Sequence, residues 1–263
     1  MRAPFDALLA TSPASSCDRI DGRRAVAVPL VGGLLAALGA SALGILAALV
    51  GVLVLTVVAI LALGNVPSTE SGHPLLAATE LVFYAAAGAF GWWRLRALRP
   101  DAFRRPTARD LRILALGIAA LVGAQVLLIW QLAVFHQGGH VQSGFEDFDV
   151  VGHSRAVTAL GVGLTVIAMV GFGPLIEEIV FRGLLFGALA SRLGVLGGAA
   201  ISAVLFGAVH GDPVLFPWLV IVGLVNAFAY AASGNLAVPV VLHALTNAVG
   251  ATILIETSLH AAR

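Results

Sequence analysis

Forty consecutive residues of this 263-residue chain, 25–64, carry no charged side chain. An α-helix needs about 20 apolar residues to cross the hydrocarbon of a bilayer. Hydrophobic residues make up 59% of the chain and charged residues 11%, whereas a soluble domain averages about 45–50% and about 25%. The long uncharged run and the composition together predict an all-α fold, a polytopic transmembrane bundle of about seven to eight helices.

The apolar segments predict where the chain crosses the membrane. We expect the first crossing at about 42–64, with residues 25–40 lying at or re-entering the interface after a break near Pro29 and its neighbouring glycines. Residues 156–190 are too long for one straight crossing, and Pro174 in GFGP predicts a bend with a helix restarting after it. The other crossings are expected at about 74–93, 112–135, 193–210, 214–232 and 236–256.

The charge distribution predicts the orientation in the membrane. All fifteen basic residues are arginines, and seven of them lie between Arg94 and Arg112, which predicts a cytoplasmic loop there. The acid-rich loop 137–155 then lies on the other side. One crossing before residue 65 places the N-terminus inside and the C-terminus outside, whereas two crossings place the N-terminus outside. We divide the chain into a cytoplasmic tail (1–24), N-terminal transmembrane helices (25–154), a core (155–256) and a C-terminal tail (257–263).

Polar side chains in the core occur at helical spacing. Three pairs are four residues apart, which places each pair on one face of a helix: Glu178 and Arg182, Phe206 and His210, and His243 and Asn247. Ionisable groups inside a membrane are costly and mark functional sites. We therefore expect three helices to direct these side chains, with Glu177, into one polar cavity.

Each of these residues also has a purely structural interpretation. Glu178 and Arg182 can form an ion pair that does no chemistry, and Phe206 can simply pack against the His210 ring. Asn247 can join two helices through a hydrogen bond, as can Asn226. Glu80, in the second crossing, has no obvious partner in the sequence and is interpreted as structural or snorkelling.

Two catalytic interpretations stay open at this point. A buried glutamate with a histidine can activate water, and a second histidine with an asparagine can stabilise an oxyanion, which suits amide hydrolysis. Alternatively, Glu178, His210 and His243 can hold a divalent metal such as zinc with an open position. The residues alone do not separate these two chemistries.

Three motifs carry a resemblance to a known family. EEIVFR (177–182), FGAVH (206–210) and HALTN (243–247) resemble the EExxxR, FxxxH and HxxxN motifs of the CPBP intramembrane proteases, also called the CAAX-protease, Abi or bacteriocin-processing family. The motifs occur in the family's order, and the resemblance covers about residues 155–256. The first 150 residues match only as generic membrane helices. The short, arginine-only and alanine-rich chain is more similar to the prokaryotic members, so we expect a prokaryotic cell membrane.

The resemblance implies a role for each motif residue. Glu177 is expected to activate the water together with His210, and His243 and Asn247 to form the oxyanion site. Glu178 and Arg182 are expected to hold the site by pairing or by contacting the substrate backbone. The resemblance favours a metal-free mechanism, with no cofactor, over a zinc-dependent one.

The function expected is an intramembrane endopeptidase that hydrolyses a peptide bond of a membrane-associated protein or peptide. A non-catalytic bacteriocin-immunity or scaffold protein is the first alternative. A transporter or channel using Glu80, Glu177 and Asn226 is the second. The expected partners are a protein or peptide substrate and the lipid bilayer, and no nucleic acid. One tension remains, because the crossings place Glu177 and His210 towards opposite membrane faces, so helices must bend or start at different depths.

Overall fold

The structure is a computed structural model, and it describes residues 26–63, 73–137 and 155–261. Within these ranges the chain forms helices and no strand, which confirms the all-α prediction. Six continuous helical stretches are present there, against the seven to eight expected. Three precede residue 140: α3 (Leu30–Leu63), α4 (His73–Leu98) and α5 (Ala108–Val134). The predicted tail 1–24 and most of the loop 137–155 lie outside the described residues, and the domain division stays a prediction.

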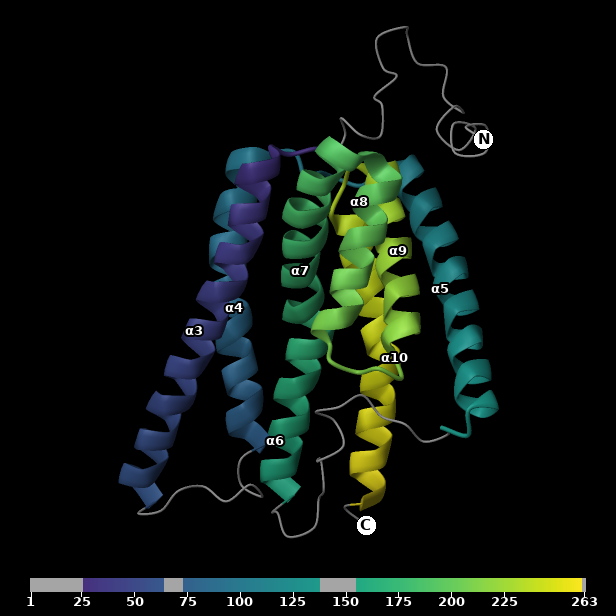
Figure 1. Cartoon of the computed structure of the whole chain (residues 1–263). Coiled ribbons are helices and arrows are strands. Elements are labelled where there is room, and N and C mark those ends of the chain that lie inside the picture. Colours follow the sequence, from purple (N-terminus) through teal and green to yellow (C-terminus); the bar gives the residue numbers. More distant parts are fainter. Residues whose placement is uncertain (1–25, 64–72, 138–154, 262–263) are drawn as a thin grey trace, which may run out of the picture.

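The fourth stretch joins five elements into one path along the bundle (Figure 1). These are α6 (Arg155–Val166), the π-helix η2 (Ile167–Phe172), α7 (Gly173–Glu178), the π-helix η3 (Ile179–Phe186) and α8 (Gly187–Val209). The expected restart of a helix after Pro174 is wrong, because Phe172 and Gly173 keep helical dihedral angles and the helix passes through the proline. The irregularity takes the form of π-helical turns on both sides of α7, and such turns often mark functional sites.

Gly194 divides α8 into two arms. Its dihedral angles, φ 75° and ψ 174°, are available almost only to glycine, so the helix ends there and returns along itself. On the returning arm Gly198 packs against the backbone of Ala190, where a Cβ atom would lie 2.8 Å from the Ala190 nitrogen. The predicted crossings 156–190 and 193–210 are therefore two arms of one helical stretch, which is why fewer stretches are present than expected.

The returning arm is short. Residues 195–209 rise by about 22 Å at about 1.5 Å per residue, less than the hydrocarbon thickness of about 30 Å. The loop to α9 (Phe216–Ser233) accordingly lies part-way down the bundle, whereas α6 and the end of α10 (Ala237–Ala261) extend further (Figure 1). The sequence placed Glu177 and His210 towards opposite membrane faces. The short arm removes this conflict, because a helix that stops early has its last residues in the interior of the bundle.

The N-terminal helix differs from expectation. Residues 25–40 do not form a separate interfacial segment, because α3 runs unbroken from Leu30 and Pro29 precedes it. Ala36, Ala37 and Ala40 are buried in the core. The glycines expected to mark a break serve close packing instead: a Cβ at Gly44 would lie 2.8 Å from the Phe83 ring on α4. Residues 30–63 thus form one helix, and its stretch long and apolar enough to cross a membrane is Leu30–Ala47, which begins before the predicted crossing at 42–64.

Hydrogen bonds join the α4–α5 connection to the α9–α10 turn. Arg104 pairs with Asp110 at 2.7 Å and donates to the Ser233 carbonyl oxygen at 2.8 Å. The backbone nitrogen of Leu236 donates to the carbonyl oxygen of Ala102. The arginine-rich loop and the start of α10 therefore lie at the same end of the bundle.

Within the described ranges, four segments are long and apolar enough to cross a membrane. They are Leu30–Ala47, Ala108–Val134, Ala159–Val209 and Phe216–Ser233, and Ala237–Thr252 is a shorter apolar segment. Many large apolar side chains on the outside of the bundle are exposed, including Leu116, Val126 and Ile129 on α5. A soluble protein buries such a surface, whereas a bilayer covers it. The chain is an integral, multi-pass membrane protein.

Candidate active site

Glu178 is the centre of a buried polar cluster formed by three helices. Its Oε1 accepts hydrogen bonds from Arg182 Nη1 at 2.9 Å, from Asn226 Nδ2 at 3.2 Å and from His243 Nδ1 at 2.9 Å. Glu178 and Arg182 are fully buried. The ion pair predicted within EEIVFR is confirmed, and so is the interhelical hydrogen bond predicted for Asn226, which joins α9 to α7.

Phe206 joins the arginine to both histidines. The guanidinium of Arg182 lies over the Phe206 ring, with its carbon 4.5 Å from the ring centre. Edge-on contacts place the His210 ring 4.8 Å and the His243 ring 5.5 Å from that same ring. The packing of Phe206 on His210 predicted from the sequence is confirmed, and the ring also fixes how far apart the two histidines lie.

Glu177 is held from the N-terminal half of the chain. The hydroxyl of Tyr84, on α4, donates to Glu177 Oε1 at 2.9 Å. Glu177 Oε2 is buried and has no hydrogen-bond partner among the described residues, although the side chain as a whole is 20% exposed. One carboxylate oxygen is thus fixed, and the other is left able to accept a hydrogen bond from water or substrate.

His243 contacts both glutamates through different nitrogens. Since a carboxylate only accepts, Nδ1 carries the hydrogen that bonds Glu178, and in the neutral ring Nε2 has a free lone pair. Nε2 lies 3.8 Å from Glu177 Oε2. Glu178 therefore orients His243 in the way that a carboxylate orients a catalytic imidazole, with the second nitrogen facing the unpartnered oxygen.

His210 lies at the end of the short arm of α8. Its Nδ1 is 2.7 Å from the carbonyl oxygen of Phe206, one turn earlier. Because a carbonyl oxygen only accepts, Nδ1 carries the hydrogen and Nε2 is the free base. His210 is half-buried, so this nitrogen is available to a group outside the protein.

Asn247 lies one helical turn after His243 on α10, and its amide nitrogen donates to the carbonyl oxygen of Met169 at 2.8 Å. Met169 belongs to η2, whose π-helical register leaves this carbonyl for a side-chain donor. Asn247 thus joins α10 to η2, as the structural interpretation predicted. An amide has two N–H groups, so the second remains for another acceptor.

The residues of the zinc alternative do not form a three-ligand site. Among the described residues, no three His, Cys, Asp or Glu side chains are grouped closely enough to hold a metal. Glu178 Oε1 already accepts three hydrogen bonds, and one donor is the Arg182 cation, whose charge opposes a second cation beside it. Glu178, His210 and His243 thus do not form the zinc site that the metal alternative expects.

Tyr84 is the site residue that sequence reasoning missed. It lies in the half of the chain that resembles the family only as generic helices, 93 positions before Glu177. Glu80, one turn earlier on α4, interacts with Tyr84, and its charge opposes that of Glu177. The partner that the sequence analysis did not identify for Glu80 is thus a hydroxyl on its own helix. A hydroxyl and a carboxylate four residues apart in an apolar segment are the available sequence signal.

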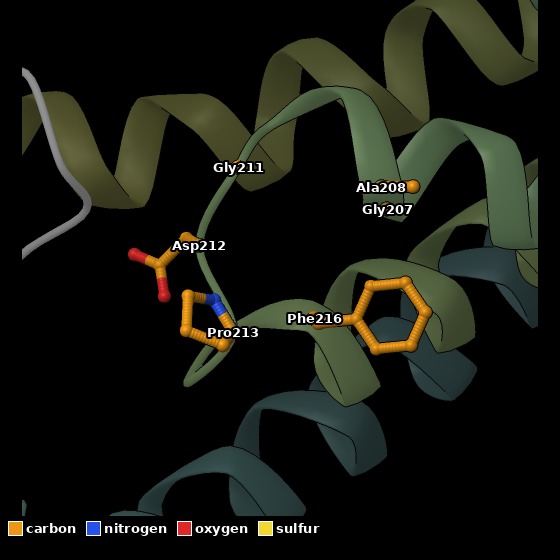
Figure 2. A pocket seen from close by; sticks show the side chains of 6 residues that line it. All are labelled: Gly207, Ala208, Gly211, Asp212, Pro213 and Phe216. Atoms are coloured by element: carbon orange, nitrogen blue, oxygen red, sulfur yellow. The ribbon is translucent and has the colours of Figure 1, made fainter.

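A cavity of about 310 Å³ lies where the α8–α9 loop leaves the bundle. Figure 2 shows the Phe216 ring directed towards α8, where it packs on Gly207. Asp212 Oδ1 accepts from the backbone nitrogens of Val214 and Leu215 and so shapes the loop. The cavity is lined by Gly207, Ala208, Gly211, Asp212, Pro213 and Phe216, so it flanks His210 in sequence without including a predicted catalytic residue.

Comparison with known proteins agrees with the three motifs. The model of the Rce1-like family, type II CAAX prenyl endopeptidases, matches residues 159–249. YdiL of Bacillus subtilis, named as a candidate membrane peptidase, is 31% identical over 121 residues, which cover 44% of this chain and 50% of YdiL. MroQ of Staphylococcus aureus, named as a membrane-embedded CAAX protease, is 26% identical over 140 residues, which cover 49% of this chain and 54% of MroQ.

The chain thus spans about half the length of the curated relatives that it matches. No solved structure gives a significant match. The family match contains all three motifs and the whole buried cluster around Glu178, and it excludes α3, α4 and α5. These findings confirm the resemblance to the prokaryotic CPBP proteins, and residues 159–249 are similar to the Rce1-like family of CAAX prenyl endopeptidases.

Proposed function

We propose that the chain is an intramembrane endopeptidase that hydrolyses a peptide bond of a membrane-associated protein or peptide. The observation that carries the proposal is Glu177 Oε2, a buried carboxylate oxygen without a partner among the described residues, 3.8 Å from His243 Nε2. A buried acceptor without a partner costs about 1–3 kcal/mol. A water molecule held at this oxygen satisfies it and is at the same time the nucleophile.

The chemistry uses groups within one site. Glu177 removes a proton from the water while the hydroxide oxygen attacks the carbonyl carbon of the scissile bond, and the carbonyl oxygen becomes the oxyanion. His210 Nε2 accepts a hydrogen bond from the same water and orients it. Collapse of the tetrahedral intermediate breaks the C–N bond, and the proton held by Glu177 passes to the leaving amine.

Glu178 acts on the reaction through His243. We propose that His243 takes a proton from solvent at Nε2 before the substrate binds, so that it donates from Nε2 while the Glu178 carboxylate stabilises the imidazolium through Nδ1. The imidazolium and the second N–H of Asn247 then donate to the oxyanion. Each donor of this kind is typically worth about 10²–10³ in rate. We propose that the reaction needs no metal, since the ligand set does not fit one.

Cleavage of a quenched peptide library by the purified protein in liposomes tests the proposal. We expect cleavage that resists chelators and is abolished by Glu177→Gln, which keeps the shape of the side chain and removes the base. His210→Ala is expected to do the same. The control is Glu256→Gln, a change to an exposed glutamate of α10, which should cleave as the wild type does.

Three outcomes would contradict the proposal in different ways. Undiminished cleavage by Glu177→Gln would remove the proposed base. Loss of cleavage with a chelator and recovery with zinc would replace the metal-free mechanism. If the chain cleaves no peptide of the library but protects cells or binds a partner, the immunity or scaffold alternative is favoured.

A further inference from the structure

A side chain on α4 approaches the proposed base from outside the three motifs and has no part in the proposed chemistry. The Tyr84 hydroxyl donates to Glu177 Oε1 at 2.9 Å. The Tyr84 side chain is half-buried, so its hydroxyl is placed in the bundle at a cost that calls for a function.

The site is shaped to admit the tyrosine. Gly173, one turn before Glu177, has no side chain, and a Cβ there would lie 3.1 Å from the Tyr84 hydroxyl oxygen and 3.0 Å from the carbonyl oxygen of Ala168. On the other side of the ring, Phe83 packs edge-on at 5.4 Å between ring centres. Gly88, one turn after Tyr84, receives the Ile176 side chain and lets α4 lie close to α7. Small residues on both helices therefore bring the hydroxyl to the carboxylate.

The number of hydrogens on Tyr84 limits what its hydroxyl can do. A tyrosine hydroxyl has one hydrogen, and here it goes to Glu177. The hydroxyl therefore holds one oxygen of the carboxylate and cannot donate to a second group at the same time.

We propose that Tyr84 is a positioning residue for Glu177. The inference rests on the proposed function for its catalytic consequence. Fixing Oε1 keeps Oε2 facing the nucleophilic water, because the terminal torsion of a glutamate is otherwise broad. Tyr84 does not touch the water or the scissile bond, so its removal slows the reaction without changing substrate affinity.

Kinetics of hydroxyl removal test the inference. We expect Tyr84→Phe to lower kcat about 10- to 100-fold, the usual value of a hydrogen bond to a charged group, with KM unchanged.

The matched control is Tyr230→Phe. Tyr230 is buried and its hydroxyl has no hydrogen-bond partner among the described residues, so its variant removes the same atom without touching Glu177. We expect wild-type kcat and KM. A fall in kcat in both tyrosine variants would indicate a general effect on the fold and would overturn the inference.

Infrared spectroscopy supplies a measurement that needs no cleavage. In protein labelled with ¹³C-glutamate, the carboxylate band of Glu177 is identified as the band that disappears in Glu177→Gln. We expect this band to shift in Tyr84→Phe and to stay in place in Tyr230→Phe. An unshifted band in Tyr84→Phe would overturn the inference even in a chain that cleaves. A shifted band in a chain that cleaves no peptide would retain the link between Tyr84 and Glu177 and would contradict the proposed function alone.

Discussion

Arg182 lies with its guanidinium carbon 4.5 Å from the centre of the Phe206 ring, inside the bundle. Its Nη1 donates to Glu178 and its Nη2 to the carbonyl oxygen of Gly223 on α9. The cation is therefore in contact with a carboxylate, a carbonyl oxygen and the Phe206 ring, contributed by three separate parts of the chain, and the Phe181 ring lies 5.9 Å away. The first two motifs meet at this contact, and the histidines of the second and third motifs pack on the same ring.

Replacing the ring tests this contact. We expect Phe206→Leu to destabilise the protein by about 2–4 kcal/mol, from lost core volume and a desolvated cation–π contact, and also to lower kcat because both histidines lose their support. Phe186→Leu is the control, since Phe186 is equally buried and packs on Tyr230 without a cation. Thermal unfolding in detergent measures stability. Equal losses of stability and activity in the two variants would show that Phe206 is only core packing.

The buried ion pair predicts non-additive mutations. Arg182→Met alone leaves Glu178 charged, buried and short of a donor, which we expect to cost about 3–5 kcal/mol. Combining it with Glu178→Gln removes the charge and keeps an oxygen that accepts from Asn226 and His243. The double variant should therefore be more stable than Arg182→Met. A double variant whose losses simply add, measured by denaturant unfolding, would mean that the pair is not coupled.

Asn247 has a structural partner and a proposed catalytic one, and one variant separates them. Asn247→Ala removes the hydrogen bond to Met169, for which we expect a loss of about 0.6–2 kcal/mol of stability. It also removes an oxyanion donor, for which we expect kcat to fall about 10²-fold with little change in KM. Thr246→Val is the control, because among the described residues the Thr246 hydroxyl bonds only the Leu242 carbonyl of its own helix. Wild-type kcat in folded Asn247→Ala would leave Asn247 a purely structural residue.

Gly194 sets the length of the arm that carries His210. We expect Gly194→Ala to destabilise the protein by about 1–3 kcal/mol, because an alanine is strained at φ 75°, ψ 174°. No atom lies within 4 Å of the Cβ position at Gly194 or at Gly123, an exposed helical glycine of α5. Gly123→Ala should therefore be neutral or stabilising by about 0.5–1 kcal/mol. Equal thermal stability of the two variants would show that the backbone angle at Gly194 is not what ends the helix.

The motif residues and their face of the helix were predictable because four-residue spacing is a local property. Glu178 and Arg182 pair directly on one helix, and Phe206 and His210 touch one turn apart, as the spacing predicted. The depth of His210 was not predictable, since it depends on the turn at Gly194, and a glycine in an apolar run does not reveal its dihedral angles. The π-helical turns around α7 were missed for the same reason: Pro174 indicates a disturbance but not its register.

The hydrogen-bond partner of Glu177 was not predictable from the sequence. Tyr84 meets Glu177 because Gly88 and Gly173 bring two helices together, and no periodicity in either segment encodes that approach. The sequence by itself determined the membrane-spanning helical class, the three polar strips and the pairing of Glu178 with Arg182, because hydrophobic length and i to i+4 contacts depend on neighbouring residues alone. Only the tertiary structure decided which carboxylate oxygen is held and which is free, because that choice belongs to helices nearly a hundred residues apart and to the small side chains that let them touch.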